Sequence, residues 1–173
     1  MTVEALRGHR PEVLADLLER YGREIQGVAF LILRDRAAAE DVLVDTLLTA
    51  LDRGDTLRDP NALRPWLLRI AVNRALSVRR SASRVVQLHI VPDREARRAD
   101  EDERLTLMSV VERLAPRMRA AVVLRYYADL PVRDVAEALG TSENTVKTQL
   151  REALEQMRRS LADTSTMPEA LHG

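Results

Sequence analysis

The chain of 173 residues contains no cysteine, which excludes disulfides, thiolate zinc sites and a cysteine nucleophile. Its three histidines, His9, His89 and His172, are too far apart in sequence to indicate a metal cluster. Aromatic residues make up only 3% of the chain and glycines number 6, a composition that argues against a β-sandwich or a β-barrel. We therefore expect no metal ion and no cofactor.

Long apolar segments are also missing. No run approaches the length of a membrane span, and no signal peptide precedes the first helical pattern, so we expect a cytoplasmic protein without membrane insertion. The sequence shows no nucleophile-base pair, no phosphate loop and no cluster of metal ligands. We therefore predict that the chain is not an enzyme, has no catalytic residues and takes no small-molecule substrate.

The abundant residues are Leu, Ala, Val, Arg and Glu, which favour helices and predict an all-α fold. Apolar residues recur at helical spacing from Pro11, again after a capping Asp35, and in a third helix from about Ala62 to near Arg80. A second group of helices begins near Asp102. The patterns predict two small helical domains joined by a flexible linker, with segments at 1–84 (first domain), 85–101 (linker), 102–161 (second domain) and 162–173 (a frayed tail).

The most informative segment is residues 130–150, in which two short helical patterns meet at a sharp turn. Gly140 stands where a helix must end in a left-handed residue, and Ser142 can cap the next helix. Val146 and Leu150 then return to the core. This spacing predicts a helix-turn-helix, a motif whose second helix enters the major groove of DNA.

Charge is unevenly distributed, although the formal net charge is zero. Residues 61–92 contain six arginines and no acidic residue, whereas acidic residues gather at Glu40, Asp41, Asp45, Asp52 and Asp55. This separation suggests two partners of opposite character. The alternative is an ordinary solvated surface with scattered charges.

Three further segments complete a resemblance to a known family. Residues 39–48 read AEDVLVDTLL, residues 66–75 read WLLRIAVNRA, and residues 114–126 read LAPRMRAAVVLRY. Together with the helix-turn-helix, they resemble the bacterial sigma factors, and among them the small extracytoplasmic-function (ECF) group, which keeps only regions 2 and 4. The resemblance covers roughly residues 10 to 160. The chain has Val44-Asp45 and Leu47 where the family usually has Gln-Glu and a Phe.

The resemblance implies a transcription initiation factor. Such a subunit binds core RNA polymerase, recognises the −35 element of promoter DNA with region 4, and opens and reads the −10 element with region 2. Polymerase carries out the catalysis. An anti-sigma factor is a further partner that the resemblance implies.

The resemblance also assigns a polymerase-binding surface to the second helix. Its candidate residues are Glu40, Asp41, Asp45 and Leu48, in which acidic groups would complement a basic coiled coil and Leu48 would add an apolar contact. The alternative is an ordinary acidic surface.

For the −10 element, the candidates are Arg58, Asn61, Arg69, Asn73, Arg74 and Arg80. Arg69 and Asn73 are four apart and project from one face of the third helix. Asparagine can donate to and accept from a base edge, and arginine can hold a phosphate or stack on a base. Trp66 is either a wedge that helps to separate the DNA strands or a residue of the hydrophobic core. We favour the core role, because its helical spacing matches Ile70.

For the −35 element, the candidates lie in and around the helix-turn-helix: Arg133, Ser142, Asn144, Thr145, Lys147, Thr148, Gln149 and Arg151. They are mostly short polar or cationic side chains that suit phosphates and base edges. Gln149 stands where the family often has a cation, so either it reads adenine or polymerase provides most of the affinity.

Two other functions fit the same features. A stand-alone DNA-binding regulator would need to dimerise, because one helix-turn-helix rarely binds tightly enough alone. A degenerate sigma-like protein would bind polymerase or an inhibitor without opening promoters.

Overall fold

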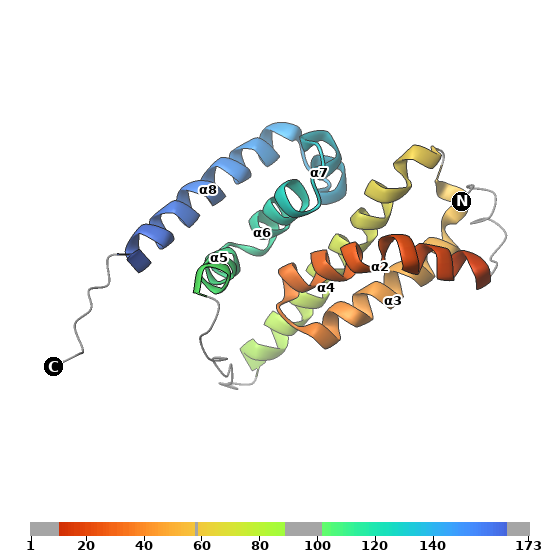
Figure 1. The fold of residues 1–173 in the computed structure, drawn as a ribbon, viewed down its shortest axis with the longest axis horizontal. Coiled ribbons are helices and arrows are strands. Elements are labelled where there is room, and N and C mark those ends of the chain that lie inside the picture. Colours follow the sequence, from red (N-terminus) through yellow and green to blue (C-terminus); the bar gives the residue numbers. More distant parts are fainter. Residues whose placement is uncertain (1–10, 58, 89–101, 166–173) are drawn as a thin grey trace.

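The computed structural model describes residues 11–57, 59–88 and 102–165. Arg58 and the three histidines lie outside these residues. Within the described ranges all regular structure is helical, which confirms the predicted all-α class. Figure 1 shows α2, α3 and α4 on one side of the molecule and α5 to α8 on the other.

The N-terminal unit consists of α2 (Pro11–Leu33), α3 (Arg36–Asp52) and α4 (Leu63–Leu88). Arg34, with φ of 61°, terminates α2 in a left-handed conformation, and Asp35 begins α3 by accepting a hydrogen bond from the Ala38 amide at 3.0 Å. The helices share a core that includes Leu17, Val42 and Leu67. The predicted starts at Pro11 and Asp35 are therefore confirmed.

The connection from α3 to α4 contains two short 3₁₀ helices, η1 (Gly54–Thr56) and η2 (Pro60–Ala62). The prediction that the third helix ends near Arg80 was wrong, because α4 continues to Leu88. Residues 81–88 contain neither glycine nor proline, so no residue in them interrupts the helix. Residues 85–88, which we expected in the linker, are thus helical.

The C-terminal unit contains α5 (Asp102–Arg113), α6 (Pro116–Val122), the π-helical turn η3 (Val123–Tyr127), α7 (Val132–Leu139) and α8 (Glu143–Ser165). α7 and α8 form the helix-turn-helix. Gly140 joins them with φ of 60° and ψ of 46°, and the Ser142 hydroxyl accepts a hydrogen bond from the Thr145 amide at 3.1 Å. Val146 and Leu150 are buried. The predicted turn, cap and core positions are confirmed.

The two units pack against each other and share one hydrophobic core. α7 lies along α4, and η3, α5 and α6 contact α2. Gly27 on α2 permits a close approach, because a Cβ there would meet the Tyr127 hydroxyl.

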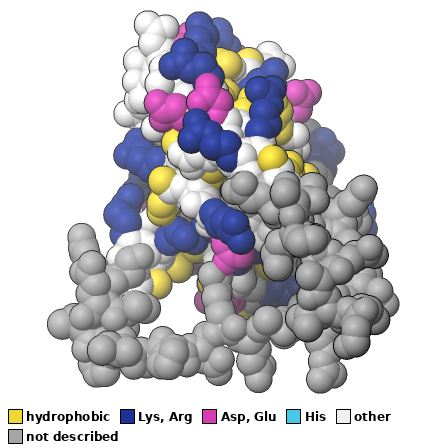
Figure 2. Space-filling view, turned by 90° about the vertical axis from the view of Figure 1, so that its left-hand side faces the viewer, with side chains coloured by type: hydrophobic (Ala, Val, Ile, Leu, Met, Phe, Trp, Pro, Cys, Tyr) yellow, Lys and Arg dark blue, Asp and Glu magenta, His cyan; other side chains and the backbone are white. Residues whose placement is uncertain are grey.

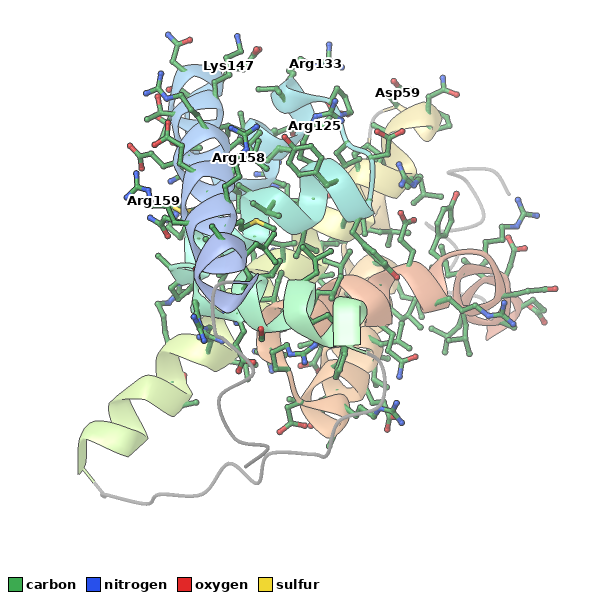
Figure 3. All side chains as sticks on the ribbon, turned by 60° about the vertical axis from the view of Figure 1, so that its left-hand side comes forward. Asp59, Arg125, Arg133, Lys147, Arg158 and Arg159 are labelled. Carbon is green, nitrogen blue, oxygen red and sulfur yellow. The ribbon has the colours of Figure 1, made fainter. Side chains whose placement is uncertain are left out.

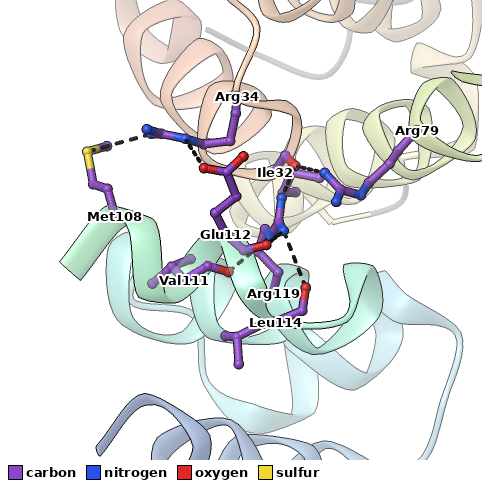
Figure 4. A network of polar contacts seen from close by, with 8 residues as sticks. All are labelled: Ile32, Arg34, Arg79, Met108, Val111, Glu112, Leu114 and Arg119. Atoms are coloured by element: carbon purple, nitrogen blue, oxygen red, sulfur yellow. Dashed lines mark hydrogen bonds and ion pairs between the residues drawn. The ribbon is translucent and has the colours of Figure 1, made fainter. Parts of the chain in front are cut away.

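A buried arginine joins the two units (Figure 4). Arg119 on α6 has 0% exposure, and its Nη1 donates to the carbonyl of Ile32 on α2 at 2.9 Å. Its other donors reach the carbonyls of Val111 at 3.1 Å and Leu114 at 3.3 Å, and also that of Glu112. These carbonyls lie at or near the C-terminal ends of α2 and α5, where the helix dipole concentrates negative charge. These carbonyl acceptors compensate the charge of the buried guanidinium.

None of the described helices combines the length and the apolarity that crossing a membrane requires.

Candidate functional surfaces

The acidic surface predicted on α3 is present and has an apolar centre. Glu40 and Asp41 are exposed at one end. Val44 and Leu48, one turn apart, leave 55% and 53% of their surfaces exposed. Asp45 is only partly exposed and is engaged within the chain, because its Oδ2 lies 2.6 Å from Arg74 on α4. The sequence reasoning included Leu48 but missed Val44 as a contact, although their i, i+4 spacing places both on one face.

A cleft of about 1210 Å³ opens between α3, the two 3₁₀ helices, α4 and α7. Four of the candidates for the −10 element line it, namely Asn61, Arg69, Asn73 and Arg74. The structure therefore brings together residues from two elements of the N-terminal unit. Arg80 lies farther along α4, exposed and not among the lining residues. Arg58 lies outside the described residues.

Two of the polar side chains that line this cleft, those of Arg69 and Asn73, already have partners. Arg69 Nη1 lies 2.9 Å from Oε1 of Glu137 on α7. The side-chain amide of Asn73 donates to the carbonyl of Arg69 at 2.8 Å and to that of Ala138, also on α7, at 3.1 Å. The donors that we expected to meet DNA thus meet acceptors of the C-terminal unit.

The cleft also has an apolar part, which Trp66 and Ile70 line. Trp66 is partly buried and packs against the core, as the core interpretation predicts, while it also contributes to the cleft wall. An aromatic face beside arginine and asparagine suits an unpaired nucleotide strand, because bases stack on aromatic rings and phosphates attract cations. The side chains of this cleft are therefore of the kinds that contact single-stranded nucleic acid.

The second candidate surface is the exposed side of α8. Asn144, Thr145, Lys147, Thr148 and Arg151 are exposed along it, and so is Ser142 at its start. Gln149 is only partly exposed, and its Oε1 is buried with no hydrogen-bond partner. Gln149 is therefore less available to a base edge than its neighbours. Lys147 lies 3.9 Å from Glu143, which reduces the positive charge of this helix.

Arg133, the remaining −35 candidate, stands at the start of α7 and has an 80% exposed side chain. Figure 3 shows Arg133 and Lys147 at the same end of the molecule. Arg133 also lines the edge of the cleft between α4 and α7. Its position therefore lies between the two candidate nucleic-acid surfaces.

Sequence reasoning missed two cations near the recognition helix. Arg125 from η3 and Arg158 from α8 line a smaller hollow together with Lys147, Arg151 and Tyr126. The spacing of Lys147, Arg151 and Arg158 along one face of α8 could have identified Arg158. Arg125 could not have been found in this way, because it comes from another element. Figure 2 shows acidic side chains interspersed among the basic ones on the side of the molecule that it views.

Sequence comparisons match both units to known families. A family model described as "Sigma-70 region 2" matches residues 17–85, and one described as "Sigma-70, region 4" matches residues 104–157. The RNA polymerase sigma-E factor of Streptomyces coelicolor is 31% identical over 134 residues, which cover 73% of each chain. The ECF RNA polymerase sigma factor SigM of Mycobacterium tuberculosis is 30% identical over 152 residues, covering 87% of this chain and 78% of SigM.

Solved structures share the same fold. The sigma factor RpoE of Bartonella quintana, in complex with the anti-sigma factor NepR, aligns with a TM-score of 0.71 at 22% identity, covering 86% of this chain and 96% of that one. CnrH, in complex with the cytosolic domain of CnrY, aligns with a TM-score of 0.67 at 20% identity, covering 93% of this chain and 95% of that one. Both comparisons extend across the two helical units.

Proposed function

The chain belongs to the sigma-70 family of RNA polymerase sigma factors, in its extracytoplasmic-function group, and we propose that its two units divide promoter recognition between them. As a sigma factor it directs RNA polymerase to promoters. Residues 17–85 correspond to region 2 and residues 104–157 to region 4. The observation that supports the division is that four of the six −10 candidates line one cleft while the recognition helix α8 stays exposed.

In this proposal the cleft of region 2 reads the unpaired −10 strand. Asn73 addresses a base edge, Arg69 and Arg74 hold phosphates, and the partly buried Trp66 offers a stacking face. Flipping a base out of the stack costs a few kcal/mol of stacking free energy, and the contacts with Asn73, Arg69, Arg74 and Trp66 would compensate for this cost. Arg58 and Arg80 remain candidates for the backbone of the same strand.

Region 4 reads the −35 duplex through α8. The exposed residues Asn144, Thr145, Lys147, Thr148 and Arg151 would contact the duplex, and Ser142 and Arg133, also exposed, would bind phosphates. Gln149 has a smaller part because its Oε1 is buried. Arg125 and Arg158 extend the basic surface beyond the residues identified from the sequence.

The α3 surface binds core polymerase in this proposal. Glu40 and Asp41 provide charge for orientation, and Val44 and Leu48 provide the apolar contact that stabilises the complex. An anti-sigma factor, like the NepR that is bound to RpoE, would compete for these surfaces. The protein works where its polymerase and promoters are, in the cytoplasm, and supplies no catalytic group of its own.

The first experiment mixes purified protein with core polymerase on a sizing column and then assays transcription from a supercoiled promoter library. We expect co-elution and promoter-dependent transcripts. A protein that elutes apart from polymerase would contradict the proposal and favour the stand-alone regulator. A protein that co-elutes but gives no transcript would favour the degenerate sigma-like alternative.

Two variants separate the surfaces. Asn73→Ala should reduce promoter opening and leave co-elution intact, whereas Asp41→Arg should reduce co-elution. Asp41 is a cleaner choice than Asp45, because replacing Asp45 would also release Arg74. Gln156→Ala and Glu19→Arg are matched controls at exposed positions of α8 and α2, and we expect wild-type behaviour from both. Wild-type transcription by Asn73→Ala would show that the −10 assignment is wrong.

A further inference from the structure

Helix α3 turns one row of its side chains toward the cleft. Asp45, Thr49 and Arg53 follow one another at intervals of four residues, and all three line the cleft. We call these three residues the cleft row. Because they recur once per turn, they lie on a single face that extends over about 12 Å. This face of α3 is therefore a wall of the same cleft that the strand-reading residues of α4 line.

The cleft row is distinct from the surface of α3 that is proposed to bind polymerase. Val44 and Leu48 precede Asp45 and Thr49 by one residue each, which turns their side chains about 100° around the helix axis. Both are more than half exposed, and neither lines the cleft. The helix thus presents two neighbouring faces, and Asp45 belongs by its position to the one that lines the cleft.

Asp45 holds the side chain of Arg74 at this wall. Its Oδ2 accepts a hydrogen bond from Nε of Arg74 at 2.6 Å and lies 2.6 Å from Nη2. These two nitrogens form one edge of the guanidinium, and among the described residues Arg74 has no further hydrogen-bond or ion-pair partner. The side chain is 52% exposed, so the edge that carries Nη1 can still meet a phosphate. An arginine that is already held in place loses less rotamer freedom when it binds.

Arg53 lies at the other end of the cleft row. Helices α3 and α4 run side by side in opposite directions (Figure 1). Counted from the contact of Asp45 with Arg74, eight residues forward along α3 lead to Arg53, and eight residues back along α4 lead to Trp66. Arg53 and Trp66 both line the cleft. Arg53 is exposed, and its guanidinium has no hydrogen-bond or ion-pair partner among the described residues.

The two walls together place a cation near each end of an aromatic surface. Trp66 lies beside Arg53 in this register, and Arg74 lies two turns farther along α4. Proteins that bind unpaired strands combine aromatic rings, on which bases stack, with cations that attract the phosphates of the backbone. The cleft row thus supplies a cation that α4 alone does not provide, and it fixes the orientation of another.

We propose that the cleft row is the second wall of the −10 site, in which Arg53 binds a phosphate of the unpaired strand and Asp45 positions Arg74 to bind another. Helix α3 then serves polymerase with one face and DNA with the neighbouring face. The inference rests on the proposed function, in which the cleft reads the −10 strand. Asp45 is a positioning residue, because it acts through Arg74 and touches no DNA itself.

Four variants test these roles, with a matched control for each type of change. Asp45→Asn removes the charge and keeps the size of the side chain, and Asp52→Asn makes the same change at an exposed position of α3 that does not line the cleft. Arg53→Ala is compared with Arg23→Ala, at an exposed position of α2 outside the cleft. Arg74→Ala and its combination with Asp45→Asn complete the set.

The probes are labelled single-stranded 12-mers, one for each strand, that cover the −10 element of the promoter most strongly transcribed from the supercoiled library. Each is titrated with the complex of the full chain and core polymerase and followed by anisotropy. Asp45→Asn should bind the preferred strand about two- to tenfold more weakly than Asp52→Asn, because Arg74 must then be ordered on binding. In the Arg74→Ala background the same change should have no further effect.

The sign of this effect separates positioning from simple charge. A carboxylate that acted only through its charge would repel the phosphates, so its removal would tighten binding of the strand. Binding by Asp45→Asn that equals or exceeds that of Asp52→Asn would overturn the positioning role, and so would a full additional loss in the Arg74→Ala background.

The role of Arg53 is read from the salt dependence of the same titration. One phosphate contact to a single strand contributes about 0.7 to the slope of log affinity against log salt. Arg53→Ala should therefore have a slope that is lower by about this amount than that of Arg23→Ala. Equal slopes for the two variants would remove Arg53 from the site.

Binding to polymerase and the effect of Asn73→Ala separate the inference from the proposed function. Asp45→Asn and Arg53→Ala should co-elute with core polymerase as their controls do. If Asp45→Asn loses polymerase binding and keeps strand binding, Asp45 belongs to the polymerase surface and the inference is wrong. If Asn73→Ala weakens strand binding while Asp45→Asn and Arg53→Ala match their controls, the −10 function stands and the second wall is wrong. If Asn73→Ala binds the strand as the wild type does, the proposed function itself fails.

Discussion

Replacing Arg119 by methionine would test whether a buried guanidinium holds the two units together. Methionine keeps much of the volume of the side chain and removes its charge and its donors. Arg119 donates to the carbonyls of Ile32, Val111, Glu112 and Leu114, and the first of these belongs to the other unit. The substitution therefore removes a polar contact across the interface and leaves the apolar packing largely in place.

The expected loss of stability follows from these partners. A net hydrogen bond from a charged group contributes about 1.5–3 kcal/mol, but removing a buried guanidinium also relieves several kcal/mol of desolvation. Two of the carbonyls keep another donor, because Arg79 donates to Ile32 at 3.2 Å and the Leu114 amide donates to Val111 at 3.2 Å. We therefore expect the free energy of unfolding to fall by about 2–4 kcal/mol, with Tm falling by roughly 2–4 °C per kcal/mol.

Urea unfolding followed by two probes would measure this loss. Trp66 is the one tryptophan of the sequence and lies on α4, so its fluorescence reports on the N-terminal unit, whereas circular dichroism reports on all helices. In the wild type the two transitions should coincide, and in Arg119→Met they should separate as the units uncouple. Arg113→Met, at an exposed position of α5, is the control. A loss below about 1 kcal/mol with coincident transitions would refute the role assigned to Arg119.

Three further predictions concern the turn and the two binding surfaces. Gly140→Ala should cost about 1–2 kcal/mol in urea unfolding, because a Cβ there meets nothing within 4 Å and only the left-handed backbone is strained; a neutral effect would contradict this. Lys147→Ala should weaken binding to −35 duplex DNA and reduce the slope of log affinity against log salt by about one, measured by anisotropy at several salt concentrations. Leu48→Asp should weaken co-elution with polymerase more than Asp52→Asn, a change at the exposed end of the same helix.

Local signals predicted the elements well. Pro11 and Asp35 mark helix starts in the sequence, and α2 and α3 begin at or directly after them. Gly140 and Ser142 specified the helix-turn-helix because a left-handed turn and a cap have few alternatives. The end of α4 was misplaced because a helix without a breaker continues as far as its own propensity and packing allow.

The contacts between the units could not be predicted in the same way. Arg119 and Ile32 are separated by 87 positions, and Arg69 and Glu137 by 68. The sequence pattern around Arg119 gives no sign that it is fully buried, since its compensation comes from helix-end carbonyls that only the tertiary fold assembles. The sequence predicted that Asn61, Arg69, Asn73 and Arg74 could share a site, and all four line the cleft. It did not predict that α7 forms the opposite wall of this cleft.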